Sequence, residues 1–184
     1  YTFFIQPLTT GFGVTELIVK ATPLILIGVG LSIGFKANVW NIGAEGQFTM
    51  GAIAGGGTAL FLNTQESFLV LPAVLLMGIL GGVVWGMIPA FLKTKFNANE
   101  ILTSLMLSYV ALLILSYLVH GPWRDPGGYN FPESEIFSDF AMLPILLEGT
   151  RLNLGTGFAL LSVLIIYILL SRTVLGYQFK VVGL

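Results

Sequence analysis

The sequence predicts an all-α protein, a polytopic bundle of about five transmembrane helices. Composition is the first reason: 55% of the 184 residues are hydrophobic and only 9% are charged, whereas a soluble domain carries about 25% charged residues. The second reason is the alternation of long apolar runs with short polar segments, since about 20 apolar residues suffice to cross a bilayer. We expect the chain to be part of a longer protein, because it begins with tyrosine and no signal peptide precedes the first apolar run.

The composition also argues against several kinds of chemistry. The chain has no cysteine and a single histidine, His120, so we expect neither a disulfide framework nor a histidine-based metal site or catalytic triad. No basic run is present at a net charge of −1, so nothing indicates nucleic acid binding. The Gly-x-x-x-x-Gly-Lys-Ser/Thr phosphate loop is absent as well. We therefore expect no catalytic residue, no metal, no cofactor and no enzymatic activity.

The first expected span covers residues 17–35. We interpret residues 1–16, which are mixed and interrupted by proline and glycine, as a loop or an interfacial segment. Pro23 would suit the first turn of the span. Gly30 and Gly34 are four residues apart and would allow another helix to approach closely.

A polar, glycine-rich segment at residues 38–50 leads into the second expected span, at 40–62. It carries Asn41, Glu45 and Gln47. Such a segment is costly against lipid and makes sense against other helices or a watery path. Asn41 could cap a helix whose first turns hold Glu45, where the helix dipole favours a carboxylate. Alternatively, the segment is a break between two half-helices deep in the membrane.

The third expected span, at 68–92, carries a stripe of small residues. Gly78, Gly82 and Gly86 fall four residues apart and would face a neighbouring helix. We expect Pro89 to lie near the end of this span and a basic turn to follow it.

The fourth expected span covers residues 100–119. Asn97, followed three residues later by Glu100, resembles a capping box with asparagine in place of serine or threonine. Ser104 and Ser108 fall on one face of this helix.

A long polar loop, residues 120–153, separates the fourth span from the fifth, at 154–170. Loops of this length are often functional, so Trp123, Arg124 and Asp125 are candidates for docking an external protein. The alternative is an ordinary solvated loop. The tail at 172–184 could be a cytoplasmic contact surface, or a frayed end.

The distribution of basic residues sets the direction of the chain across the membrane. One set of span ends carries most of them: Lys36, Lys93, Lys95, Arg172 and Lys180. These ends should be cytoplasmic, because short loops rich in lysine and arginine remain inside. The long loop would then be external.

Three polar residues of the segment at 38–50 are candidates for lining a translocation path. Glu45 is the acid placed closest to the hydrocarbon zone, so it could line a path, or it could simply be a helix-start carboxylate. Asn41 and Gln47 could bind a hydroxylated or heterocyclic solute, or could satisfy freed backbone groups. Trp85 could line a cavity, although a packing role is the simpler interpretation.

Several of these segments, in this order, resemble the permease subunits of bacterial ABC importers for branched-chain amino acids, simple sugars and nucleosides. The resemblance covers nearly the whole chain and rests on residues 24–38, 40–47, 99–109, 121–128 and 172–184. The form Asn-Ile-Gly-Ala-Glu-Gly-Gln, together with the loop Arg-Asp-Pro-Gly-Gly, most resembles the nucleoside-type permeases.

The resemblance implies a multi-pass protein of the bacterial inner membrane that transports nucleosides by alternating access. It implies a second permease subunit, identical or related, and cytoplasmic ATP-binding subunits that dock near Lys180, Val181 and Gly183. An extracytoplasmic solute-binding protein would deliver the solute, and the permease itself would do no covalent chemistry. A ribose-like sugar is the alternative substrate within this family. An ion- or proton-coupled carrier and a non-transporting scaffold are the alternatives outside it.

Overall fold

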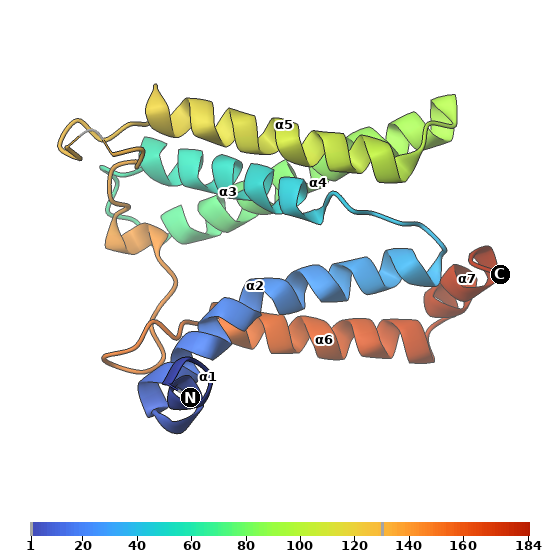
Figure 1. Cartoon of the computed structure of the whole chain (residues 1–184), viewed down its shortest axis with the longest axis horizontal. Helices are drawn as coiled ribbons and strands as arrows, with labels where there is room; N and C mark the ends of the chain where they lie inside the picture. Colours follow the sequence, from blue (N-terminus) through green and yellow to red (C-terminus); the bar gives the residue numbers. More distant parts are fainter. Residues whose placement is uncertain (1, 130) are drawn as a thin grey trace. The chain divides into compact units, whose positions relative to one another are not determined.

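A computed structural model describes residues 2–129 and 131–184, and this part of the chain is built from helices, which confirms the all-α prediction (Figure 1). Tyr1 and Asn130, which fall in two of the expected segments, lie outside the described residues. The chain forms two compact units. The first combines the residues up to Val39 with Leu143–Leu184, and the second consists of Trp40–Met142.

The first unit contains α1 (Thr2–Thr9), α2 (Gly11–Lys36), α6 (Gly155–Arg172) and α7 (Val174–Val182). Helices α2 and α6 lie side by side, drawn in blue and orange in Figure 1. Two polar contacts fix the position of α2 along α6. The Thr22 and Thr156 hydroxyls are 3.0 Å apart, and Arg151, just before α6, forms a two-pronged ion pair with Glu16 of α2, with Nε 2.9 Å from Oε1.

Of the two alternatives for residues 1–16, the loop is wrong for the described part, which is helical, whereas an interfacial position stays a prediction. Helix α2 begins at Gly11 because Thr10 caps it, its hydroxyl accepting a hydrogen bond from Gly13 N at 3.2 Å. Pro23 consequently lies inside α2 and not in its first turn, a position that membrane helices tolerate. A side chain at Gly30 would meet no atom within 4 Å, so no described helix makes the close approach that we expected there.

The second unit contains α3 (Ala44–Phe61), α4 (Val70–Phe96), α5 (Glu100–His120) and the short 3₁₀ helix η1 (Asp139–Ala141). Helix α3 packs against both α4 and α5. Helices α3 and α4 are antiparallel, whereas α3 and α5 are parallel. Helix α3 is therefore the central element of this unit.

Glycines set the spacing between α3 and α4. A β-carbon on Gly51 would lie 3.0 Å from the carbonyl oxygen of Gly78, and one on Gly82 would lie 3.3 Å from that of Gln47. The predicted stripe of Gly78, Gly82 and Gly86 thus faces α3. The tightest contact is at Gly81, which the stripe did not include: its β-carbon would lie 2.5 Å from that of Ala54.

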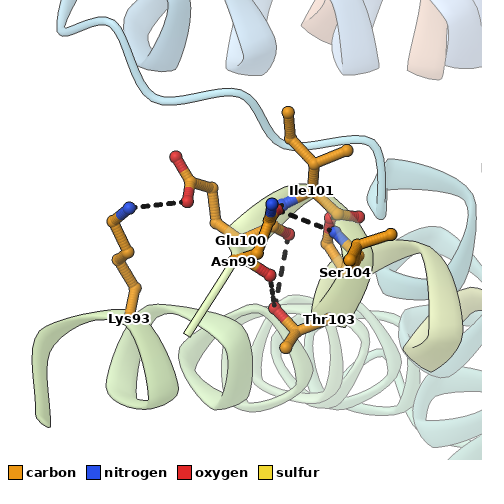
Figure 2. A network of polar contacts seen from close by, with 7 residues as sticks. Lys93, Asn99, Glu100, Ile101, Thr103 and Ser104 are labelled. Carbon is orange, nitrogen blue, oxygen red and sulfur yellow. Dashed lines mark hydrogen bonds and ion pairs between the residues drawn. The ribbon is translucent and has the colours of Figure 1, made fainter. Parts of the chain in front are cut away.

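The turn between α4 and α5 differs from the predicted capping box (Figure 2). Helix α4 continues to Phe96, and Asn97 ends it in the left-handed conformation with φ 52°. The helix cap is Asn99, whose side-chain oxygen accepts hydrogen bonds from Ile101 N at 3.0 Å and Leu102 N at 3.2 Å. Glu100 instead pairs with Lys93 across the turn, Nζ to Oε2 2.8 Å.

Within the described part of the chain, four helices are long and apolar enough to cross a membrane: α2, α4, α5 and α6. Helix α3 has 18 residues, but Glu45, Gln47 and several glycines reduce its hydropathy. Pro89 lies inside α4 and is buried, so it does not mark the end of that span.

Candidate translocation site

The polar segment at 38–50 contains a helix start. Helix α3 begins at Ala44, with Glu45 in its first turn. Asn41 is not the cap that we expected, because Gly43 occupies that position. The Asn41 side chain instead accepts a hydrogen bond from Gly43 N at 2.9 Å and closes a tight turn just before the helix.

Glu45 points away from the neighbouring helices. It is exposed and shares one face of α3 with Phe48 and Ala52, which are also exposed and follow at intervals of three and four residues. The residues that contact α5 and α4, such as Gly46 and Gly51, lie on other faces of the helix. Within the second unit, the carboxylate is therefore available for a solute or for a further helix.

Gln47 lies on a different side of α3. A β-carbon on Gly86 of α4 would lie 3.2 Å from Cδ and Nε2 of Gln47, so the amide covers that glycine. The structure does not gather the three candidate path residues into one cluster: Asn41 bonds its own backbone, Gln47 packs over α4, and Glu45 faces outward.

Two serines of α5 hold the backbone of the polar segment. Ser104 and Ser108 are buried, and their hydroxyl oxygens accept hydrogen bonds from Ile42 N and Gly46 N, each at 3.3 Å. The sequence placed these serines on one face of a helix but offered no partner for them.

Trp85 of α4 is half-buried, and its indole N–H is buried without a hydrogen-bond partner among the described residues.

The long loop packs against the C-terminal end of α3. A β-carbon on Gly57 would lie 2.9 Å from the Trp123 ring, so the tryptophan covers this glycine. The Asn63 side chain, just after α3, donates to Ile136 O at 3.3 Å and accepts from Ser138 N at 2.8 Å. Gly57 and Asn63 thus anchor the loop to the end of α3, and the sequence analysis singled out neither of them.

The three candidate docking residues of the loop have different surroundings. Trp123 is half-buried on α3, and Arg124 is exposed beside a backbone bridge to Ser134. Asp125 shapes the turn: its carboxylate accepts a hydrogen bond from Gly127 N at 2.8 Å, and its own N–H donates to Glu133 O at 2.9 Å. Arg124 is thus the most accessible of the three.

The tail is a helix, α7, capped by the Thr173 hydroxyl, which accepts from Gly176 N at 3.3 Å. Lys180 and Val181 are exposed near its end. Gly183, just after it, lies against the carbonyl oxygen of Lys36 at the end of α2, where a β-carbon would collide.

The loop residue Arg151 joins the start of α6 to α2 through its ion pair with Glu16. The hydrogen bond to Glu16 raises the pKa of the Arg151 guanidinium above the usual value.

Comparisons with known proteins agree on one family. The family described as branched-chain amino acid transport system / permease component matches residues 13–184. The chain is 40% identical to the glucose ABC transporter permease protein TsgB13 of Haloferax volcanii, over 98% of this chain and 50% of that protein. It is 30% identical to the guanosine ABC transporter permease protein NupP of Bacillus subtilis, over 92% of this chain and 49% of that protein.

A third relative, the nucleoside ABC transporter permease protein NupB of Lactococcus lactis, is 27% identical over 98% of this chain and 52% of that protein. The chain thus spans about half the length of these relatives. No solved structure matches it.

Proposed function

The chain belongs to the family of branched-chain amino acid transport system permease components, and we propose that it helps to form the translocation path of an ATP-driven importer. This membership confirms the resemblance found in the sequence. The observation that carries the proposal is the extent of the match, residues 13–184, which includes the polar segment, the long loop and α7. The permease subunit is not an enzyme, and ATP hydrolysis would reside in separate partner subunits.

The proposed solute is a nucleoside, and a simple sugar is the second candidate. Two relatives named for guanosine or nucleosides support the first, and the more similar relative named for glucose supports the second. Both solutes are neutral and rich in hydroxyl groups. An exposed carboxylate such as Glu45 can accept hydrogen bonds from such hydroxyls, and bonds to a charged group are the stronger ones.

The proposed mechanism is alternating access in a bacterial inner membrane. ATP-binding subunits would contact the tail at Lys180, Val181 and Gly183, and a solute-binding protein would contact the loop at Trp123, Arg124 and Asp125. A second permease subunit would complete the path. Binding and hydrolysis of ATP would bias two conformations of the helices. Glu45 would give the path an exposed polar group, and Asn41 and Gln47 would add to the polar lining where their own contacts leave them accessible.

Uptake in living cells tests the proposal and separates its two substrates. Labelled uridine, ribose and glucose would be supplied to cells with and without the full-length gene. Loss of uridine uptake alone supports the nucleoside assignment, whereas loss of ribose or glucose uptake keeps the importer and replaces the substrate. Unchanged uptake of all three solutes would contradict both assignments.

A further inference from the structure

The start of α3 lacks the side-chain cap that helices commonly have. A serine, threonine, aspartate or asparagine at the cap position normally accepts a hydrogen bond from the second or third amide of the helix. Here the cap residue is Gly43, which has no side chain to do so. The amide of Gly46, third in the helix, donates instead to the Ser108 hydroxyl of α5 at 3.3 Å. The cap of α3 is therefore supplied by a neighbouring helix.

Ser104 makes an equivalent contact one turn earlier. Its hydroxyl accepts a hydrogen bond from Ile42 N at 3.3 Å. Both serine hydroxyls also donate within α5, Ser104 to Ile101 O at 3.2 Å and Ser108 to Ser104 O at 3.3 Å. Each serine hydroxyl thus donates its proton to a carbonyl oxygen of α5. The lone pairs of the hydroxyl oxygen remain free to accept a hydrogen bond from an amide at the start of α3.

Two glycines make this contact possible. A β-carbon on Gly43 would lie 2.7 Å from the β-carbon of Ser104, and one on Gly46 would lie 2.7 Å from the α-carbon of Ser108. Ser104 is 2% exposed and Ser108 is 4% exposed, so both serines are buried where α3 meets α5. If α3 moved away from α5, the Gly46 amide would lose its partner in the buried contact, which is costly in an apolar environment.

We propose that Ser104 and Ser108 are positioning residues that hold the first turn of α3 against α5, so that the two helices move together during transport. Glu45 would move with them, because it lies in that first turn, exposed on a face that does not contact α5. The serines would thereby fix the position of the carboxylate relative to α5. The part played by Glu45 rests on the proposed function, whereas the joint movement of α3 and α5 does not.

The test uses spin labels on the full-length permease with its partner subunits in lipid vesicles. Cysteines would replace two exposed residues, Phe48 of α3 and Met106 of α5, in a segment that has no cysteine of its own. We expect the same distance distribution without nucleotide and with ATP trapped. A distance that changes between these two states would overturn the proposal without any serine variant.

The second arm removes the hydroxyls. The double variant Ser104→Ala and Ser108→Ala should broaden the distance distribution and lower uptake about fivefold or more. Ser116→Ala is the matched control, because Ser116 is an exposed serine of the same helix, and it should change neither quantity. An unchanged distribution in the double variant would refute the positioning role. If the unaltered protein shows no ATP-dependent uptake, the proposed function fails, while the width of the distribution still decides the role of the serines.

Discussion

Glu45 occupies a place that favours a carboxylate for two separate reasons. It lies in the first turn of α3, where the helix dipole stabilises negative charge. It is also exposed on a face of α3 that neither α4 nor α5 covers. A side chain in this place is accessible from outside the second unit, as we propose for a residue that lines the path.

Replacing Glu45 with glutamine should lower solute uptake roughly tenfold, since a hydrogen bond to a charged group is lost while the shape of the side chain is kept. The amount of permease in the membrane should stay the same. Glu66→Gln is the control, because Glu66 is an exposed acid in the turn after α3. Labelled-solute uptake, normalised to permease in the membrane, measures both variants. Equal uptake by the Glu45 variant and the unaltered protein would remove this residue from the mechanism.

The close approach at Gly46 predicts a strong effect of a small substitution. Gly46→Val should reduce the free energy of unfolding by about 1–3 kcal/mol, because the new side chain would collide with the Ser108 backbone. Gly28→Val is the matched control, since a β-carbon at Gly28 would meet no atom within 4 Å. Thermal unfolding of the two purified variants in detergent compares them. Similar melting temperatures would show that α3 and α5 are not as close as described.

At the scale of the elements, the apolar runs predicted the helices, but local chemistry decided where they begin and end. The glycines near Thr10 suggested a break, yet the Thr10 hydroxyl caps α2 at Gly11. Asn97 was expected to start α5, but it ends α4 in the left-handed conformation, and Asn99 starts α5. Two asparagines so close together have similar propensities for both positions, so the sequence could not separate their roles.

The polar residues of the site could be picked from the sequence, but their partners could not. Glu45 was recognised as an acid close to apolar runs, and the structure indeed places it in the first turn of a helix. The bond from Gly46 to Ser108 joins residues 62 positions apart, and no local pattern reveals such a pair. The same holds for Trp123 on Gly57 and for Asn63 on the long loop.

The contact between Trp123 and Gly57 should hold the long loop on the end of α3. Trp123→Ala should free the loop and increase its rate of cleavage by added protease, because the ring that covers Gly57 is lost. Tyr129→Ala is the control, since Tyr129 is 94% exposed in the same loop. Limited proteolysis of permease in membranes measures the two rates. Cleavage of the Trp123 variant at the unaltered rate would mean that the tryptophan does not anchor the loop.

At the scale of the whole molecule, the composition alone predicted a membrane protein, and four apolar helices and the family match agree with it. The chain spans about half of its relatives, so transport is a property proposed for the whole assembly. We propose that the ATP-binding subunits contact this chain at helix α7, where Lys180 is exposed in the last turn.

Reversing the charge at this place should weaken the assembly. Lys180→Glu should reduce the amount of ATP-binding subunit that copurifies with the permease by about half or more, since a contact at a protein interface tolerates an opposite charge poorly. Lys20→Glu, an exposed lysine of α2 at the end expected to be external, is the control. Quantitative copurification from detergent extracts compares the two variants. Undiminished copurification by the Lys180 variant would place the contact elsewhere.

Whether uptake depends on ATP or on the membrane potential decides whether this permease belongs to an ATP-driven importer. The full-length permease and its partner subunits would be assayed for uptake of the solute identified in cells, once with ATP depleted and once with the membrane potential collapsed. We expect that ATP depletion abolishes uptake and that collapse of the potential leaves it intact. Uptake that continues without ATP but stops when the potential collapses would contradict the importer assignment and indicate an ion-coupled carrier.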